Sequence, residues 1–214
     1  MKSFVITMLE KKKSIDAADR CIDSGVKQGL SIQYFRAVTP KDPIDDLLSH
    51  QGISKDGFRE KFSRLDNCIA AFLSHYALWF QCAKGNEEYQ IFEHDAVIVA
   101  PIPEFINYQG CISLGKPSYG KYSDPTQIGV NPLTSKRYFP GAHAYRLKPA
   151  AAKLLIEQAK KAAKPTDVFL HADTFPWLEE YYPWPVEAHD TFTTIQRTEG
   201  CLAKHNYSDK YEII

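Results

Sequence analysis

The sequence has no net charge and no long apolar run, and these two absences exclude several classes of protein. Its 214 residues carry 26 Lys and Arg against 26 Asp and Glu, so the formal net charge is zero. Without an excess of positive charge, the chain has no bulk attraction for nucleic acid or anionic membranes. The most apolar stretch, residues 69–80, spans only about 12 residues and is too short to cross a bilayer. We therefore expect no nucleic-acid partner and no integral membrane segment.

The chain also lacks the cysteine and glycine motifs that mark several enzyme classes. None of its five cysteines forms a C-x-x-C pair, and a chain of this length does not need disulfide bonds to be stable. We therefore expect reduced, mostly buried thiols in a cytoplasmic protein. Neither G-x-x-x-x-G-K-[ST] nor G-x-G-x-x-G occurs, which argues against a P-loop nucleotidase and against a dinucleotide-dependent oxidoreductase.

Apolar periodicity predicts alternating strands and helices along most of the chain. The composition, 44% hydrophobic and 24% charged, is that of a globular protein with one core. The expected strands are residues 3–7, 32–38, 89–92, 96–100, 111–114, 142–147 and 167–171, and the expected helices are residues 11–28, 66–84 and 149–164. This alternation predicts an α/β fold, a single-domain three-layer sandwich with a mostly parallel central sheet over residues 1–214. In such sheets, ligands bind beyond the carboxyl ends of the strands.

Three segments do not follow this alternation. Residues 116–139 are rich in proline and tyrosine; we interpret them as a mobile acceptor-binding loop, with a surface excursion as the alternative. The aromatic residues of segment 177–185 either line an acceptor groove or pack the C-terminal segment onto the sheet. Residues 196–214 form a polar tail.

Glu93, His94 and Asp95 directly follow one of the expected strands. In extended backbone, the side chains of Glu93 and Asp95 point one way and that of His94 points the other way. Two neighbouring carboxylates suit Mn²⁺ or Mg²⁺, and such an ion can neutralise a diphosphate. The same three residues also fit a solvated acidic turn, so both interpretations stay open at this point.

The surroundings of this triplet resemble a known family. Residues 67–79 read NCIAAFLSHYALW and residues 89–96 read YQIFEHDA. Together they resemble glycosyltransferase family 25, the lipopolysaccharide-type galactosyltransferases and their collagen-modifying relatives. The pattern of that family is a G-x-I-G-C-x-L-S-H-x-x-x-W helix, followed by a strand that ends in E-D-D. The matching residues are Ile69, Leu73, Ser74, His75, Trp79, Glu93 and Asp95.

Further elements of the family pattern follow in order. GAHAY (residues 141–145) resembles its G-x-x-A-Y strand, PTD (165–167) its P-[IV]-D element, and residues 185–195 its closing segment. FVITM and YFRAVTP, near the start of the chain, are similar to its opening segments. The departures are His94 for the middle acid, Asn67 and Ala70 for the helix glycines, Thr7-Met8-Leu9-Glu10 for an N-L-D-R opening, and His189 for the final Gln.

The resemblance implies a GT-A-like fold and the inverting transfer of a hexose, galactose or glucose, from a UDP-sugar to a hydroxyl of a glycan or another acceptor. Asp95 and Glu93 would contact the donor and hold Mn²⁺ or Mg²⁺ against the leaving diphosphate. Ser74 and His75 would contact the donor or hold the triplet, although a buried Ser–His pair is also typical of ordinary polar contacts in a core. His143 is either a packing residue or a substrate contact.

An inverting transfer needs one base for the acceptor hydroxyl. Asp167 matches the acid of the family's P-[IV]-D element, and Asp173 lies close to it in the sequence. Both are candidate catalytic residues. Their structural alternatives are a strand-entry or capping acid for Asp167, and a turn or N-cap residue for Asp173.

Two other functions fit parts of the sequence. Since His94 replaces an acid of the family triplet, the chain could be a degenerate member that binds a sugar nucleotide without turning it over. The pairs His94-Asp95, His171-x-Asp173 and His189-Asp190 would form a hydrolytic metal centre if the fold brought them together. A transferase should lose activity but not folding on Asp95→Ala, whereas a hydrolase should cleave simple phosphoesters without any sugar nucleotide.

Overall fold

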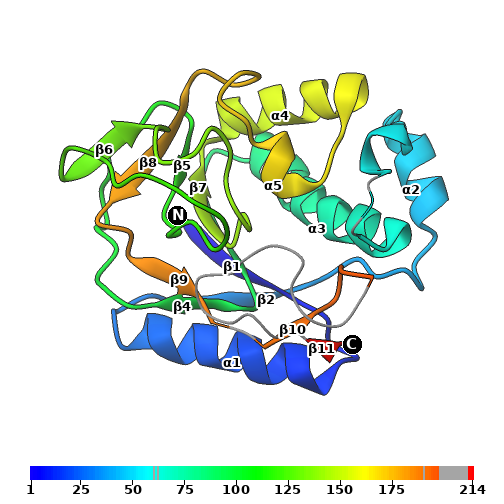
Figure 1. Cartoon of the computed structure of the whole chain (residues 1–214), viewed down its shortest axis with the longest axis horizontal. Coiled ribbons are helices and arrows are strands. Elements are labelled where there is room, and N and C mark those ends of the chain that lie inside the picture. Colours follow the sequence, from blue (N-terminus) through cyan, green and yellow to red (C-terminus); the bar gives the residue numbers. More distant parts are fainter. Residues whose placement is uncertain (60, 62, 190, 198–211) are drawn as a thin grey trace.

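The computed structural model describes residues 1–59, 61, 63–189, 191–197 and 212–214 (Figure 1). The helices are α1 (Lys12–Val26), α2 (Ile44–Gln51), the 3-10 turn η1 (Asp56–Phe58), α3 (Leu65–Lys84), α4 (Pro149–Ala162) and α5 (Thr166–Phe169). The strands are β1 (Lys2–Thr7), β2 (Gln33–Arg36), β3 (Tyr89–Glu93), β4 (Ala96–Ile98), β5 (Cys111–Ser113), β6 (Gly129–Pro132), β7 (Ala144–Leu147), β8 (Leu178–Tyr182), β9 (Val186–Ala188), β10 (Phe192–Thr193) and β11 (Glu212–Ile213).

A seven-stranded sheet in the order β2-β1-β3-β7-β5-β8-β6 forms the centre of the fold. β1 pairs in parallel with β2 and β3, and β5 pairs in parallel with β8. β7 runs antiparallel to β3 and β5, and β6 runs antiparallel to β8. The predicted α/β class is confirmed, and the sheet is mixed: five strands point one way, and β7 and β6 point the other. β7 begins at the edge of the sheet where β3 and β5 end, with Ala144 opposite Phe92, and therefore runs in the opposite direction to both.

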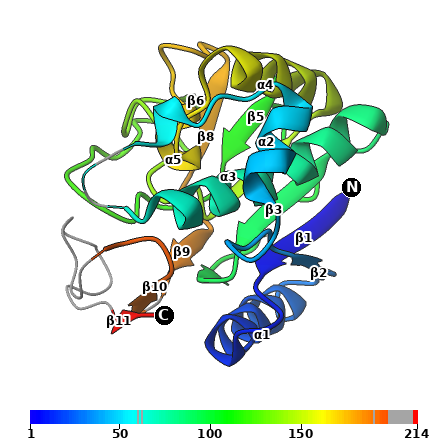
Figure 2. The same cartoon turned by 90° about the vertical axis from the view of Figure 1, so that its right-hand side faces the viewer.

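Helices cover both faces of the sheet, as Figures 1 and 2 show. α1 packs on one face, where its residues Ala18 and Cys21 join a core with Val5 and Phe92. α3 and α4 pack against each other on the opposite face and form the larger core. The predicted three-layer arrangement is confirmed.

Strand β3 supplies side chains to both cores in alternation. Ile91 belongs to the core under α3 and α4, whereas Phe92 belongs to the core under α1. Because successive side chains of a strand point to opposite faces, Glu93 lies on the same face as Ile91. Glu93 lies opposite Ile6 of β1 in the sheet register. Ile91 lies opposite Tyr145 of β7. β3 therefore places Glu93 under α3, at the edge where β1, β2 and β3 end.

The predicted strand at residues 167–171 is wrong. The short helix α5 lies there, and it begins directly after Pro165. In its first turn the Asp167 carboxylate accepts the backbone N–H of Val168 at 2.8 Å. A segment of five residues is too short for its apolar period to distinguish a strand from a helical turn.

The expectation of little regular structure in residues 116–139 is wrong for part of this segment. Gly129–Pro132 form β6, the last strand of the sheet, which tolerates a proline because one side of an edge strand makes no ladder hydrogen bonds. Beyond β6, the buried Glu180 accepts the backbone N–H groups of Thr134 and Ser135 through Oε1, both at 2.7 Å. The residues that follow β6 are thereby fixed to β8. The mobility expected for the rest of residues 116–139 stays a prediction.

Three further expectations concerned the polar tail, the cysteine thiols and the lack of a membrane-spanning segment. Most of the predicted polar tail, residues 198–211, lies outside the described residues, while Glu212–Ile213 pair with β10 as β11. The cysteines at positions 21, 68, 82 and 111 are buried thiols, and Cys201 lies outside the described residues. Among the helices that the structure describes, none is long and apolar enough to cross a bilayer.

Candidate active site

A cavity of about 560 Å³ lies at the edge of the sheet where β1, β2 and β3 end. This is the predicted place for a ligand in an α/β sheet. One part of its lining is apolar and consists of Ile6, Met8, Ala37, Val38, Ala70 and Ala71. The other part is polar and consists of Ser74, His75, Glu93, His94, Asp95, Tyr119 and Asp167. Five of the predicted site residues (Ser74, His75, Glu93, Asp95 and Asp167) therefore meet in one cavity.

Residues 192–196 form a further wall of this cavity. Arg64, directly before α3, fastens the wall: its backbone N–H donates to the Ile195 carbonyl at 2.7 Å, and its Nη2 donates to the Thr194 carbonyl at 2.6 Å. The same Nη2 is 3.1 Å from the carbonyl of Ile214. The cavity is thus lined by residues from both ends of the described chain, Ile6 and Met8 from one and residues 192–196 from the other.

Two serines hold the backbone on the apolar side of the cavity. Ser14 Oγ, on α1, accepts the N–H of Met8 at 3.0 Å. Ser74 Oγ, on α3, accepts the N–H of Val38 at 2.9 Å and donates to the Ala70 carbonyl at 2.9 Å. Ser74 thereby fixes the segment that follows β2, which is the structural one of its two predicted roles.

The acidic triplet lies at the transition from β3 to β4. Glu93 ends β3, and His94 and Asp95 form a turn, so the alternation expected for extended backbone does not apply and all three residues line the cavity. His94 Nδ1 lies 3.0 Å from Ser14 Oγ. Burial and the nearby Arg20 lower the pKa of His94 to about 4, so this side chain is neutral at pH 7.

His75 connects Glu93 to the interior of the protein. Its Nε2 lies 2.9 Å from Glu93 Oε1, and its Nδ1 lies 2.9 Å from the hydroxyl of Tyr145. Trp79 Nε1 donates to the same hydroxyl at 2.7 Å. Burial lowers the pKa of His75 to about 3, and burial together with the nearby Asp167 raises the pKa of Glu93 to about 8.

Asp167 reaches the cavity from a separate element, at the start of α5. The hydroxyl of Tyr119 donates to Asp167 Oδ2, and the Val168 N–H donates to Oδ1. Burial and the Asp167 charge raise the pKa of Tyr119, so the phenol keeps its proton and remains a donor. Through Tyr119, the proline- and tyrosine-rich loop contributes directly to the cavity.

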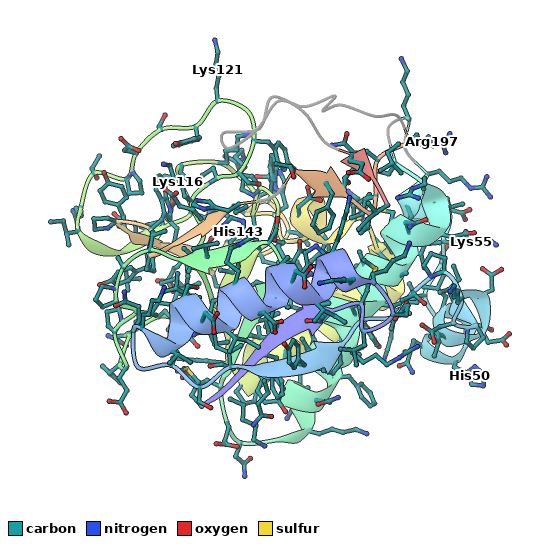
Figure 3. All side chains as sticks on the ribbon, turned by 90° about the horizontal axis from the view of Figure 1, so that it is seen from below. His50, Lys55, Lys116, Lys121, His143 and Arg197 are labelled. Atoms are coloured by element: carbon teal, nitrogen blue, oxygen red, sulfur yellow. The ribbon has the colours of Figure 1, made fainter. Side chains whose placement is uncertain are left out.

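Two predicted site residues lie outside the cavity. Asp173 is 61% exposed; it forms an ion pair with Arg137 and lines a separate hollow of about 220 Å³ together with His171. His143 is 2% exposed, lies in the interior next to β7 (Figure 3) and packs against Gly115, where a Cβ atom would come within 2.5 Å of its Nε2. Burial lowers the pKa of His143 to about 4. In contrast, Lys55 and Lys121 extend outward from the surface in the same view.

A comparison with known families agrees with the sequence pattern around α3 and β3. The sequence model of glycosyltransferase family 25 (LPS biosynthesis protein) matches residues 1–111, just over half of the 214-residue chain. The chain belongs to glycosyltransferase family 25. A search of curated proteins finds no match. The matched region of this glycosyltransferase contains Glu93 and Asp95, and it ends before Tyr119 and Asp167.

The family 25 resemblance implies a divalent metal ion, and Asp95 fits one. Asp95 lies in the cavity wall and has the hard carboxylate oxygens that Mn²⁺ and Mg²⁺ prefer. Within the described part of the chain, no three His, Cys, Asp or Glu side chains are grouped as a complete metal site. Ions of this kind commonly take one or two carboxylates and complete their shell with substrate phosphates and water. Glu93 fits such an ion less well, because its Oε1 is already engaged by His75.

The three His/Asp pairs of the hydrolase hypothesis do not share one cavity. His94 and Asp95 line the main cavity, whereas His171 and Asp173 line the smaller hollow. Asp190, of the third pair, lies outside the described residues. The family assignment and this separation both favour the glycosyltransferase.

Sequence reasoning did not include Tyr119 and Tyr145 among the site residues of this family 25 chain. Tyr119 contacts Asp167 across 48 residues of sequence, and Tyr145 contacts His75 across 70. The tyrosine content of the loop and the G-x-x-A-Y motif were the available signals. Neither signal shows which carboxylate or imidazole a phenol will meet.

Proposed function

We propose that this glycosyltransferase moves a hexose, galactose or glucose, from a UDP-sugar to a glycan hydroxyl with inversion, on a GT-A-like fold. The observation that carries the proposal is the convergence of Glu93, Asp95 and Asp167 on one cavity whose lining also includes apolar residues. These carboxylates come from a strand end, a turn and a separate helix. Acids from separate elements fit a reaction in which one holds the donor and another activates the acceptor.

The donor would lie along the ends of β1, β2 and β3. The apolar lining near Ala37 and Val38 suits the flat face of a nucleobase, and the acidic triplet lies next to it. Asp95 would hold Mn²⁺ or Mg²⁺, which supplies charge neutralisation for the departing diphosphate when it is bound. Glu93, with one oxygen taken by His75 and a side chain 31% exposed, would form a hydrogen bond with a hydroxyl of the donor sugar.

Asp167 is the proposed general base. It would accept the proton of the acceptor hydroxyl while that oxygen forms a bond to the anomeric carbon. The bond from this carbon to the diphosphate oxygen breaks on the opposite face, and UDP leaves with the electron pair. Tyr119 holds Asp167 by a hydrogen bond. The place of Asp167 inside the cavity favours it over Asp173, which is exposed and paired with Arg137.

Thermal unfolding with UDP, UDP-galactose and UDP-glucose, each with and without Mn²⁺, tests the donor assignment. A ligand at 100 times its Kd stabilises the folded state by about 2.7 kcal/mol. We expect UDP to raise the Tm in the presence of Mn²⁺, and Asp95→Asn to remove that dependence on Mn²⁺. The absence of any shift with a uridine nucleotide would contradict the donor assignment.

The substitution of the middle acid by His94 favours a second candidate, a protein that binds a sugar nucleotide without transferring the sugar. Release of UDP from UDP-galactose or UDP-glucose, measured with a glycan acceptor, distinguishes the two. A transferase releases UDP faster when acceptor is added. The binding protein shows the Tm shift and releases no UDP.

A further inference from the structure

Four side chains form a continuous hydrogen-bonded chain beneath the cavity. Trp79 Nε1 is 2.7 Å from the Tyr145 hydroxyl, which is 2.9 Å from His75 Nδ1, and His75 Nε2 is 2.9 Å from Glu93 Oε1. Trp79, Tyr145 and His75 are at most 1% exposed. His75 and Glu93 both line the cavity, and Glu93 is the member with a partly exposed side chain.

Donor and acceptor chemistry fixes the direction of every link in this chain. The indole N–H of Trp79 can only donate, so the Tyr145 oxygen accepts there. The phenol then has one proton of its own, and the other polar group bonded to this hydroxyl in the described structure is His75 Nδ1. If Nδ1 also donated, the buried phenol proton would have no acceptor, which carries a substantial free-energy cost. Tyr145 therefore donates to Nδ1.

The tautomer of His75 follows from this direction. Because Nδ1 accepts, the ring proton of the neutral imidazole is on Nε2, and Nε2–H donates to Glu93 Oε1. Oε1 is then an acceptor whatever the protonation state of the carboxyl. The second oxygen of Glu93 is left for a ligand in the cavity.

We propose that Trp79, Tyr145 and His75 are positioning residues that hold the Glu93 carboxyl in one orientation toward the hydroxyl of the donor sugar. The proposal rests on the proposed function for its substrate. The arrangement resembles the way second-layer hydrogen bonds fix a functional side chain elsewhere in enzymes, since each rotamer is set by a partner that is itself buried. If these three side chains only stabilised the fold, their substitution would lower stability but would not lower kcat while donor affinity stays the same.

The tautomer can be tested without substrate, by long-range ¹H–¹⁵N correlation on protein labelled at its histidines. The His75 signals are assigned by their loss in His75→Gln. We expect a neutral ring protonated at Nε2, with the Nδ1 resonance shifted by Tyr145→Phe, which removes only the hydroxyl. The matched control is Tyr76→Phe. Tyr76 is also buried, but its hydroxyl donates to Gln51, which is not one of the four hydrogen-bonded side chains. A ring protonated at Nδ1, or at both nitrogens, would overturn the inferred direction.

Steady-state kinetics with UDP-sugar and acceptor test the effect on Glu93. We expect Tyr145→Phe to lower kcat about tenfold, the range of one lost hydrogen bond, with KM for the donor and the UDP-induced Tm shift unchanged. His75→Gln keeps an N–H donor and should retain more activity than His75→Ala. Equal kcat values for Tyr145→Phe and Tyr76→Phe in an active enzyme would overturn the positioning role. A wild-type protein without turnover would overturn the proposed function instead. The NMR result would still decide which group donates in the hydrogen bond between Tyr145 and His75.

Discussion

The two halves of the sheet differ in how they contribute to the cavity. β2, β1 and β3 are parallel neighbours, so their carboxyl ends meet at one edge and form the floor on which the acidic triplet lies. The second half contains the reversed strands β7 and β6, and it reaches the cavity through a loop residue, Tyr119, and through Asp167 on a short helix. The parallel half provides a binding surface by regular geometry. The mixed half adds single side chains by irregular connections.

The largest expected effect is on kcat, and it tests whether the second half of the sheet contributes to the reaction while the first half binds the nucleotide. Asp167→Asn should lower kcat by about 10²–10⁴-fold, the usual contribution of a general base, with the UDP-induced Tm shift retained. Initial rates and thermal unfolding on the same preparations measure both quantities. Asp173→Asn is the matched control and should stay close to wild type. Equal losses in the two variants would contradict the assignment of the base.

The next prediction tests whether the halves unfold together. Phe72 on α3 is fully buried and contacts both Phe58 and Phe169, the latter from the second half. Phe72→Ala should lower the free energy of unfolding by about 3–5 kcal/mol in a single transition, measured by urea unfolding followed by fluorescence and circular dichroism. Phe80→Ala, on the same helix but 36% exposed, should cost clearly less. Two separate transitions would show that the halves are independent.

A smaller effect is expected from the contact that orders the loop of the second half. Glu180→Ala removes the acceptor of two backbone N–H groups and should cost about 1–3 kcal/mol. Hydrogen exchange at Thr134 and Ser135 should become faster, while amides of β1 and β3 keep their protection. Glu157→Ala, an exposed ion-pair residue on α4, serves as the control and should change stability clearly less than Glu180→Ala. Unchanged exchange at Thr134 and Ser135 would show that Glu180 does not hold the loop.

The smallest expected effect lies in the first half, directly after β2. The Thr39 N–H and Arg36 hold the pKa of Asp42 below its usual value of 3.8. Because the folded pKa is the lower one, the stabilisation is fully present above the unfolded pKa and is lost as the pH falls through the folded pKa. Asp42→Asn should therefore cost about 1 kcal/mol or less at pH 7, and the difference from wild type should vanish in acid. Urea unfolding at pH 7, 5 and 3 measures it, and a difference that grows in acid would contradict this sign.

The contrast between the halves also explains what could be predicted from the sequence. α3 has a long, clear apolar period, so its bounds followed directly. The short run of residues 89–92 after this helix was correctly predicted as a strand, which placed Glu93 at a strand end. Asp167 was identified as a site residue, but the strand predicted at residues 167–171 was wrong because so short a segment contains too little periodic information. β6 was missed because Gly129 and Pro132 are turn residues, and its partner β8 lies about 50 residues further along the chain.

Contacts between distant segments were the part that local patterns could not supply. Nothing near Tyr119 in the sequence shows that it meets Asp167, and nothing near His75 shows that it meets Tyr145. Similarly, only packing shows which of Asp167 and Asp173 reaches the cavity, because each is an isolated acid in the sequence. Strand reversal at β7 has the same origin, since side-chain alternation is identical in either direction.

The strand order has a consequence for the way a ribosome makes this chain. β3 lies between β1 and β7, so it obtains one neighbour early in synthesis and the other only when residues 144–147 have emerged. During that interval the nascent sheet presents an unpaired apolar edge along Tyr89–Glu93, the kind of edge that joins with foreign strands. Translation speed across residues 94–143 therefore sets how long this edge stays open to aggregation.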